Sequence, residues 1–332
     1  MFIPKFGRLG ARAVISFVLF ANHFVAVARP SGEESLTSLA LWATTGQWAE
    51  ARQVPNATAP ITDDDAVTEQ SPEVVFEETV ATQHYFRTPD GLGLRYAYFP
   101  TPYAANFEPP LTVVFVPGYR LPIETFRSFI IQLLHFGVDV WIFDFAGQGG
   151  SETPADSTGI YERHLTHLVY FIEHIVPAQR IILGGFSMGG AIVLRHAQGI
   201  LAERIVGVMV FAPTTFWRES YTVRDPRNLP WLGQSRLFSA SFDDLACLPN
   251  SLGEMPLFWA TPTEDRLIDS ARNEALCRRL GGELVRHHHY ACGHNILTDD
   301  ESAINEARVQ LFENLLAWLN ETFPNTHNNS TL

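Results

Sequence analysis

Short apolar runs alternate with longer stretches of helical periodicity along most of this chain, and this alternation constrains the fold more than any other feature. The runs have the length and composition of buried parallel strands, and we expect strands at Leu111 to Val116, Val138 to Phe143, Arg180 to Leu183, Ile205 to Phe211, Leu257 to Ala260 and Glu283 to His287. We expect helices at Glu124 to His135, Tyr161 to Ile175, Ala191 to Leu201, Asp269 to Leu280 and Ser302 to Trp318. This order predicts an α/β fold, with a mostly parallel central sheet covered by helices on both faces and ligands at the carboxyl ends of the strands.

The first 28 residues have the composition of an export signal. Basic residues precede an uncharged run from Ala13 to Ala28, and Ala26-Val27-Ala28 supplies the small residues that a signal peptidase accepts. The run is shorter than the roughly 20 apolar residues that span a bilayer. We therefore expect a signal peptide, or an N-terminal anchor with peripheral membrane contact, and an exported location (periplasmic or secreted) rather than a cytoplasmic one. A buried N-terminal helix is the alternative.

The remaining chain divides by composition into a spacer, a folded domain and a tail. Residues 29–79 are rich in small polar and acidic residues, which predicts a poorly ordered spacer, although 36–51 could form a surface helix. A hairpin around Thr88-Pro89-Asp90-Gly91 opens the domain, expected at 80–322, and 323–332 form a flexible tail. An insert at about 214–254 interrupts the alternation and predicts a short lid, with a plain surface excursion as the alternative.

Composition and charge limit the classes of partner. The 332 residues are 46% hydrophobic and 18% charged, as in a globular protein with a large core. The net charge of -13 includes no basic stripe that could follow phosphates, so nucleic acid is not an expected partner. Cys247, Cys277 and Cys292 could include one disulfide in an exported protein, or could all be buried thiols.

A glycine-flanked serine lies between an expected strand and an expected helix. The segment Gly185-Phe186-Ser187-Met188-Gly189 follows the apolar run that begins at Arg180. A serine on so sharp a turn needs small neighbours, because side chains at the two glycines would collide with adjoining backbone. Ser187 is therefore the predicted nucleophile.

A serine hydroxyl needs a base to take its proton, and the base needs an acid that holds its tautomer. Asp265 and His294 follow the next two candidate strands, at the same edge of the sheet as Ser187. They are the predicted acid and base, in the chain order Ser, Asp, His. Glu264 is an alternative acid, whereas Asp269 is expected to cap a helix.

The other histidines have weaker claims to a role. His287, His288 and His289 are consecutive on a strand, so they point to alternate faces and are poorly placed to chelate a metal together. His164, His167 and His174 lie on an expected helix, where surface or partly buried positions are expected for them.

The oxyanion formed on attack requires backbone N–H donors. We expect one from Met188, directly after the nucleophile, and one from Tyr119 in the loop after the first parallel strand, where Gly118 lets the backbone approach the substrate. Aromatic residues of the insert are candidates to cover an acyl chain: Phe216, Trp217 and Trp231.

Four motifs in this order resemble the lysophospholipase and monoacylglycerol lipase family of serine hydrolases: Asp144-Phe145-Ala146-Gly147-Gln148-Gly149-Gly150-Ser151, Gly185-Phe186-Ser187-Met188-Gly189-Gly190, Asp265-Arg266-Leu267-Ile268-Asp269 and Gly293-His294. The similarity runs from about Gln83 to Trp318. It implies the α/β-hydrolase fold, hydrolysis of an acyl ester through an acyl-enzyme intermediate, no cofactor, and a triad of Ser187, Asp265 and His294 with Tyr119 and Met188 as oxyanion donors.

Two positions depart from the family pattern. Pro117-Gly118 stands where relatives commonly have His-Gly, and the insert is short beside many family lids. The leading hypothesis is a carboxylic ester hydrolase whose substrate is a fatty acyl or similarly apolar ester, such as a lysophospholipid or monoglyceride. Alternatives are a thioesterase, another acyl transferase or perhydrolase on the same triad, and a non-catalytic binding protein with this fold.

Overall fold

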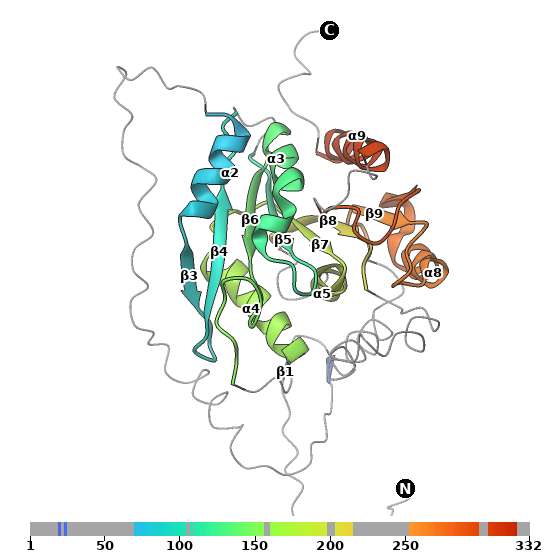
Figure 1. The fold of residues 1–332 in the computed structure, drawn as a ribbon. Coiled ribbons are helices and arrows are strands. Elements are labelled where there is room, and N and C mark those ends of the chain that lie inside the picture. The colour runs from blue at the N-terminus through green and yellow to red at the C-terminus, as the bar shows by residue number, and fades with distance from the viewer. Residues whose placement is uncertain are drawn as a thin grey trace, which may run out of the picture. The chain divides into compact units, whose positions relative to one another are not determined.

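The computed structural model describes residues 70–103, 107, 109–155, 160–197, 203–214, 252–298 and 305–323, together with two short strands near the N-terminus. Those strands, β1 (Leu19–Phe20) and β2 (His23–Phe24), pair antiparallel. Contacts divide the chain into two units, Met1–Ala66 and Val67–Leu332, and the second unit contains the fold (Figure 1). Apart from these two strands, the predicted signal segment lies outside the described residues, and so do the helix expected at 36–51, Cys247 and nearly all of the insert and the tail.

An eight-stranded sheet forms the centre of the second unit, in the order β10-β9-β8-β7-β5-β6-β4-β3. The strands are β3 (His84–Arg87), β4 (Gly93–Phe99), β5 (Thr112–Val116), β6 (Asp139–Phe143), β7 (Ile181–Phe186), β8 (Ile205–Phe211), β9 (Leu257–Pro262) and β10 (Val285–Tyr290). β4 pairs antiparallel with β3 and with β6, and the remaining pairs are parallel. All six expected strands and the hairpin are present, and the predicted α/β-hydrolase fold is confirmed.

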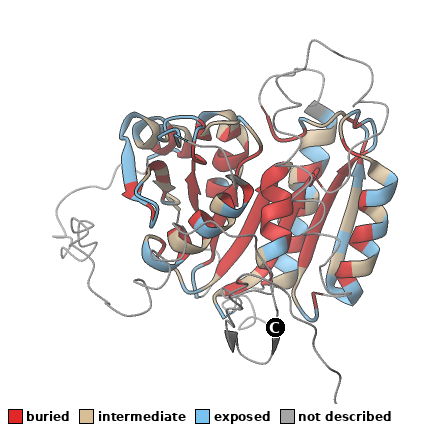
Figure 2. Cartoon of the chain, turned by 90° about the horizontal axis from the view of Figure 1, so that it is seen from below, coloured by how far each residue is buried: buried red, intermediate tan, exposed pale blue. Residues whose placement is uncertain are grey.

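Helices cover both faces of the sheet. They are α2 (Pro72–Ala81), η1 (Ile123–Phe126), α3 (Arg127–His135), α4 (Ile160–His174), α5 (Met188–His196), α8 (Ser270–Gly281), η3 (Gly282–Leu284) and α9 (Asn305–Thr322). One core cluster joins the sheet to α2, α3 and α9, and a second joins it to α4, α5 and α8. Figure 2 shows the strands buried between helices that expose their outer sides. Among the described residues, no helix is both long and apolar enough to cross a bilayer.

The folded domain begins earlier and ends later than the sequence predicts. Residues 72–79 belong to α2 rather than to the spacer: Ser71 caps this helix by accepting from the Val74 N–H, and Phe76 stacks on Phe99 with ring centroids 5.1 Å apart. At the other end Phe323 is buried and packs against Trp318, so it is not part of a flexible tail. Buried aromatic rings therefore define both boundaries.

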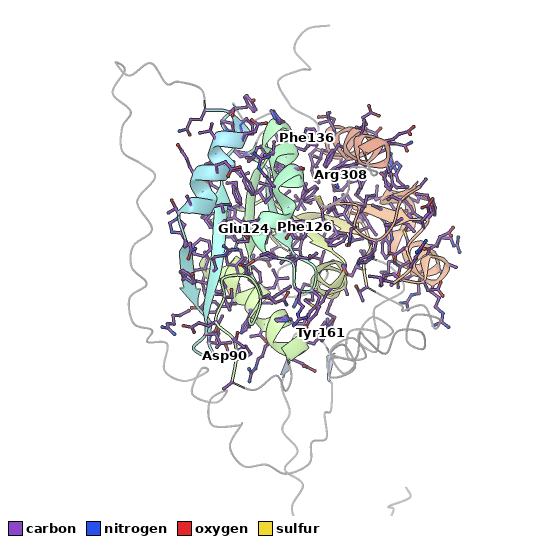
Figure 3. All side chains as sticks on the ribbon, viewed as in Figure 1. Asp90, Glu124, Phe126, Phe136, Tyr161 and Arg308 are labelled. Atoms are coloured by element: carbon purple, nitrogen blue, oxygen red, sulfur yellow. The ribbon has the colours of Figure 1, made fainter. Side chains whose placement is uncertain are left out.

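The tip of the hairpin is fastened to a helix. Gly91 adopts a φ of 84°, which the tight turn requires, and the Thr88 hydroxyl accepts from the Leu92 N–H at 3.0 Å. Figure 3 shows Asp90 at this tip, where its carboxylate lies 2.9 Å from Nε2 of His167 on α4. Contrary to expectation, His167 and His164 are both buried, at 1% exposure, while His174 is exposed.

Candidate active site

Ser187 stands on a strained turn between β7 and α5, formed by Gly185 to Gly189 and here called the elbow. Its φ is 52° and its ψ is -117°, values that a residue with a side chain rarely adopts. The turn is compact, because a Cβ on Gly185 would lie 2.5 Å from the Gly189 oxygen and a Cβ on Gly189 would lie 2.1 Å from the Val116 oxygen. The two glycines are thus required for the steric reason that the sequence suggests.

A continuous hydrogen-bonded chain joins the three predicted triad residues. Nε2 of His294 lies 2.9 Å from Oγ of Ser187, and Nδ1 lies 2.7 Å from Oδ2 of Asp265. Since a carboxylate only accepts hydrogen bonds, Nδ1 carries the imidazole proton and Nε2 is left as the acceptor for the Ser187 hydroxyl. This is the protonation pattern that a base needs to receive the serine proton.

Asp265 is held for this task by its own loop. Its side chain is 2% exposed, and Oδ1 accepts from the backbone N–H groups of Leu267 at 2.8 Å and Ile268 at 2.9 Å. The alternative acid, Glu264, is exposed, and Asp269 caps α8 by accepting from Arg272 N–H, as expected. Asp265 is therefore the carboxylate that orients His294.

The loop after β5 lies beside β7, the strand that leads to Ser187, since β5 and β7 are neighbours. A Cβ on Gly118 would lie 2.9 Å from the side chains of Leu121 and Phe186, so this position is closely packed. Arg120 adopts a φ of 60°, and its N–H donates to Oε1 of Gln148. The structure thus places both expected oxyanion donors, Tyr119 and the first residue of α5, Met188, at the ends of adjacent strands.

A buried ionic network supports that loop from the side of β6. Asp144, with no exposed surface, accepts from Ile123 N–H at 3.0 Å, from Gly150 N–H at 2.9 Å and from Arg95 Nε at 2.6 Å. Arg95 also pairs with both carboxylate oxygens of Glu124, at 2.6 and 2.8 Å, and these bonds raise its pKa. Burial raises the pKa of Asp144 despite these partners. The glycine-rich segment after β6 therefore fixes η1 and the loop after β5, here called the oxyanion loop.

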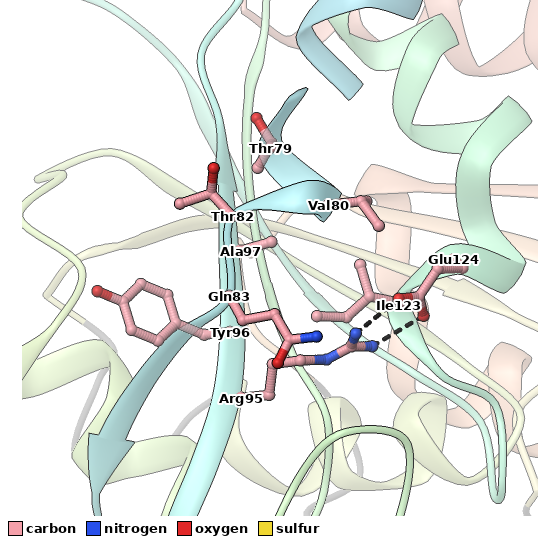
Figure 4. Close-up of a pocket in the computed structure, with 9 residues that line it drawn as sticks. All are labelled: Thr79, Val80, Thr82, Gln83, Arg95, Tyr96, Ala97, Ile123 and Glu124. Carbon is pink, nitrogen blue, oxygen red and sulfur yellow. Dashed lines mark hydrogen bonds and ion pairs between the residues drawn. The ribbon is translucent and has the colours of Figure 1, made fainter. Parts of the chain in front are cut away.

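The network borders a small cavity of about 10 Å³ (Figure 4). Its lining comes from α2, β4, η1 and the turn between α2 and β3: Thr79, Val80, Thr82, Gln83, Arg95, Tyr96, Ala97, Ile123 and Glu124. None of these is a predicted site residue, and Arg95 is already paired with two carboxylates. We assign the cavity no part in the chemistry.

Ser187 has one close neighbour that the sequence did not predict. Oγ1 of Thr214 lies 2.9 Å from Oγ of Ser187, and Thr214 N–H donates to the Ser187 carbonyl at 2.9 Å. Thr214 lies three residues beyond β8, at the same edge of the sheet as the three triad residues. Its position directly after an apolar run was the signal that could have marked it.

The three consecutive histidines of β10 divide between its two faces. His287 bonds to Thr261 Oγ1 at 2.9 Å and packs on His289, while His288 packs on the ring of Phe258. Within the described part of the chain, no group of three or more His, Cys, Asp or Glu residues could hold a metal ion. The expected acyl-covering residues Phe216, Trp217 and Trp231 lie outside that part.

Comparisons with known proteins agree with this architecture. Residues 113–266 match the model of a family described as the alpha/beta hydrolase family. A soluble variant of monoglyceride lipase from Saccharomyces cerevisiae is 15% identical, with a TM-score of 0.58 over 72% of this chain and 96% of that one. The Pyrococcus furiosus esterase Pf2001 is 17% identical, with a TM-score of 0.51 over 72% and 89% of the two chains.

The alpha/beta hydrolase domain-containing protein 10 from mouse has the same fold, with 14% identity and a TM-score of 0.53 over 72% of this chain and 99% of that one. Among curated proteins, none matches this sequence. At these identities the structural likeness shows the fold, and the activity must be argued from the residues of the site.

Proposed function

We propose that this chain, whose fold is that of the α/β hydrolases, is a serine hydrolase that cleaves carboxylic esters through an acyl-enzyme intermediate. The observation that carries the proposal is the unbroken hydrogen-bond chain from Asp265 through His294 to Ser187. The strained backbone at Ser187 adds to it, because such strain concentrates at functional sites.

The geometry supports a two-step reaction. Ser187 Oγ attacks the acyl carbon while its proton passes to Nε2 of His294, and the carbonyl π electrons move to the oxygen. The carbonyl then re-forms, the bond to the leaving oxygen breaks, and His294 protonates the departing alcohol. Water repeats the sequence on the acyl-enzyme: it loses a proton to His294, releases the acid and restores the Ser187 hydroxyl.

Two features would lower the barriers to both steps. Asp265 stabilises the imidazolium that forms on His294. The backbone N–H groups of Leu267 and Ile268 hold the Asp265 carboxylate in place. The N–H groups of Tyr119 and Met188 would meet the oxyanion, with Gln148 holding the neighbouring Arg120 N–H and so fixing the loop.

For the substrate we propose an ester of a fatty acyl or similarly apolar acid, such as a monoglyceride or lysophospholipid. Support comes from the motif resemblance, from the name of the yeast structural neighbour, monoglyceride lipase, and from the aromatic content of the insert, which holds Phe216, Trp217 and Trp231. Pockets for acyl chains are lined mainly by apolar and aromatic side chains.

A series of p-nitrophenyl esters of increasing acyl length tests both the serine mechanism and the proposed preference for an apolar acyl group. Wild-type protein should hydrolyse them with a preference for longer acyl groups, and it should also release fatty acid from a monoglyceride or a lysophospholipid. Ser187→Ala should lose this activity, while the control Ser128→Ala on α3 should keep it. Preference for acetyl over every longer chain would remove the lipid assignment, and equal activity of Ser187→Ala would remove the serine mechanism.

We also propose that residues 1–28 direct export, on the basis of the basic, apolar and small-residue order described above. N-terminal sequencing of the mature protein should then begin near Arg29. An intact Met1 in a cytoplasmic fraction would contradict this assignment.

A further inference from the structure

We infer that Thr214 is a further catalytic residue, whose hydroxyl donates a hydrogen bond to Ser187 Oγ and thereby speeds release of the acyl group relative to its uptake. The inference rests on the proposed function, because it assumes that Ser187 becomes acylated. It starts from the 2.9 Å contact between the two hydroxyl oxygens.

The direction of this hydrogen bond follows from the triad. His294 Nε2 is the acceptor for the Ser187 proton, because Nδ1 donates its proton to the Asp265 carboxylate. The single hydroxyl proton of Ser187 is therefore committed to His294. Thr214 must then be the donor, and Ser187 Oγ receives it through a lone pair.

The position of Thr214 is fixed by contacts on several sides. Ala212 adopts a φ of 45°, uncommon for a residue with a side chain, and its N–H donates to the Ala260 carbonyl at 3.0 Å. The Pro213 carbonyl accepts from the side-chain amide of buried Asn273 at 3.0 Å. Thr214 itself is 1% exposed. Such a site holds a hydroxyl in one place relative to the nucleophile.

Sheet topology separates Thr214 from the oxyanion donors. β8, which leads to Thr214, lies beside β7 on the side opposite β5. The oxyanion loop follows β5, whereas the loops after β9 and β10 carry Asp265 and His294. Thr214 thus approaches Ser187 from the side of the acid and the base, which points to an action on Oγ rather than on the carbonyl oxygen.

The chemistry of Oγ changes during the reaction, and the value of the Thr214 hydrogen bond changes with it. In the free enzyme Oγ is a hydroxyl oxygen and a good acceptor. In the acyl-enzyme it is the alkyl oxygen of an ester, whose lone pair is delocalised toward the carbonyl, and it accepts more weakly. The hydrogen bond therefore stabilises the free enzyme relative to the acyl-enzyme.

The effect is greatest when the second tetrahedral intermediate collapses. Water has then bonded to the acyl carbon and given a proton to His294. The carbonyl re-forms, the bond between that carbon and Oγ breaks, and Oγ leaves with the electron pair before taking the proton from His294. Thr214 donates to Oγ as negative charge develops there and transfers no proton itself. During acylation the same hydrogen bond already stabilises the starting Ser187 hydroxyl. It therefore lowers the barrier to acylation less than it lowers the barrier to deacylation.

The test separates the two steps by stopped-flow kinetics with p-nitrophenyl butyrate, with the acyl-enzyme fraction read by acid quench and intact-protein mass spectrometry. Thr214→Val keeps the shape of the side chain and removes the donor. We expect its deacylation constant to fall about fivefold, as for loss of a neutral hydrogen bond, with acylation within twofold of wild type and a larger acyl-enzyme fraction in the steady state. Where deacylation limits turnover, kcat and KM fall together and kcat/KM is preserved.

Three variants complete the comparison. Thr214→Ser retains the hydroxyl and should restore deacylation, whereas Thr214→Ala should behave as Thr214→Val. The control is Thr261→Val, a buried threonine at the end of β9 whose hydroxyl bonds to His287, and it should leave both constants within twofold of wild type.

Unchanged deacylation in Thr214→Val, an equal fall in both constants, or failure of Thr214→Ser to restore the rate would overturn the inference while leaving the serine mechanism standing. Absence of any acyl-enzyme in the wild-type protein would overturn the proposed function together with it.

Discussion

Nε2 of His294 lies 2.9 Å from Oγ of Ser187, although 107 residues separate them in the chain. The contact forms because β7 and β10 end at the same edge of one sheet, with β8 and β9 between them. The ring of Phe186 also packs against the His294 imidazole, with centroids 5.3 Å apart, so the elbow itself helps to hold the base. Ser187 and His294 are therefore brought together by the sheet and not by local sequence.

Replacing the acid tests its role in setting the tautomer of the base. In Asp265→Asn the amide can donate to Nδ1 of His294, which moves the imidazole proton to Nε2 and removes the acceptor for the serine proton. We expect kcat to fall by about 10⁴-fold, as in triads where this change has been made. The control Asp269→Asn alters a helix cap in the same loop and should keep kcat. A fall in kcat of less than tenfold in Asp265→Asn would mean that another residue serves as the acid.

Gln148 is expected to act on the reaction by positioning the oxyanion loop. Gln148→Leu removes the acceptor of the Arg120 N–H. Because loss of an oxyanion donor costs about 10² to 10³ in kcat, displacement of one should cost less, about tenfold, with little change in KM. Gln148→Glu keeps an acceptor oxygen and should recover most of the rate. If both variants lose activity equally, the hydrogen bond is not the cause.

Two buried histidines should make the protein sensitive to acid. Burial lowers the pKa of His164 to about 3 and that of His196 to about 4, whereas an unfolded histidine titrates near 6.5. The unfolded chain therefore binds protons that the folded chain does not, and the stabilising effect present above pH 6.5 is lost as the pH falls toward the folded values. The loss amounts to about 2 kcal/mol for each histidine at pH 5.

Urea unfolding at pH 7 and pH 5 measures this loss. In His164→Leu the drop in unfolding free energy between the two pH values should be smaller than in wild type by about 2 kcal/mol. His174→Leu removes an exposed imidazole from the same helix and serves as the control. A His164→Leu variant with the full wild-type drop would contradict the assignment.

The elbow should tolerate no side chain at Gly189. An alanine Cβ there would lie 2.1 Å from the Val116 carbonyl oxygen, and backbone cannot yield as a flexible side chain can. We expect Gly189→Ala to lose thermal stability and Ser187-dependent activity together. Gly293→Ala, whose Cβ would meet nothing within 4 Å, is the matched control for stability. Equal melting temperatures for the two variants would contradict this prediction, because the elbow would then accommodate a side chain at position 189.

The sequence predicted the features that depend on local pattern. Apolar runs marked the strands, and the loops directly after three of them held Ser187, Asp265 and His294. Helix α2 was missed because its acids, such as Glu73 and Glu77, resemble those of the preceding spacer, while its buried Val75 and Phe76 are few. Burial against β4 and α3, and not periodicity, makes this segment part of the domain.

The contacts that support the site could not be predicted from local sequence pattern. Arg95 on β4 and Asp144 directly after β6 are 49 residues apart, and β4 and β6 pair antiparallel, so no spacing rule joins the two residues. Thr214 reaches Ser187 through a turn in which Ala212 has a positive φ. No glycine at this position signals that turn in the sequence. Contacts of this kind depend on the three-dimensional path of the chain, which residue type alone does not specify.

The central claim is that Ser187 is the nucleophile, and mapping of a fluorophosphonate adduct tests it most directly. After labelling and proteolysis, peptide mass spectrometry should find the adduct on Ser187 in the wild-type protein and none in Ser187→Ala. Asp265→Asn and His294→Ala should label far more slowly, because the serine proton then has no competent acceptor. An unlabelled wild-type protein under conditions that label a control esterase, or an adduct on another residue, would contradict the account.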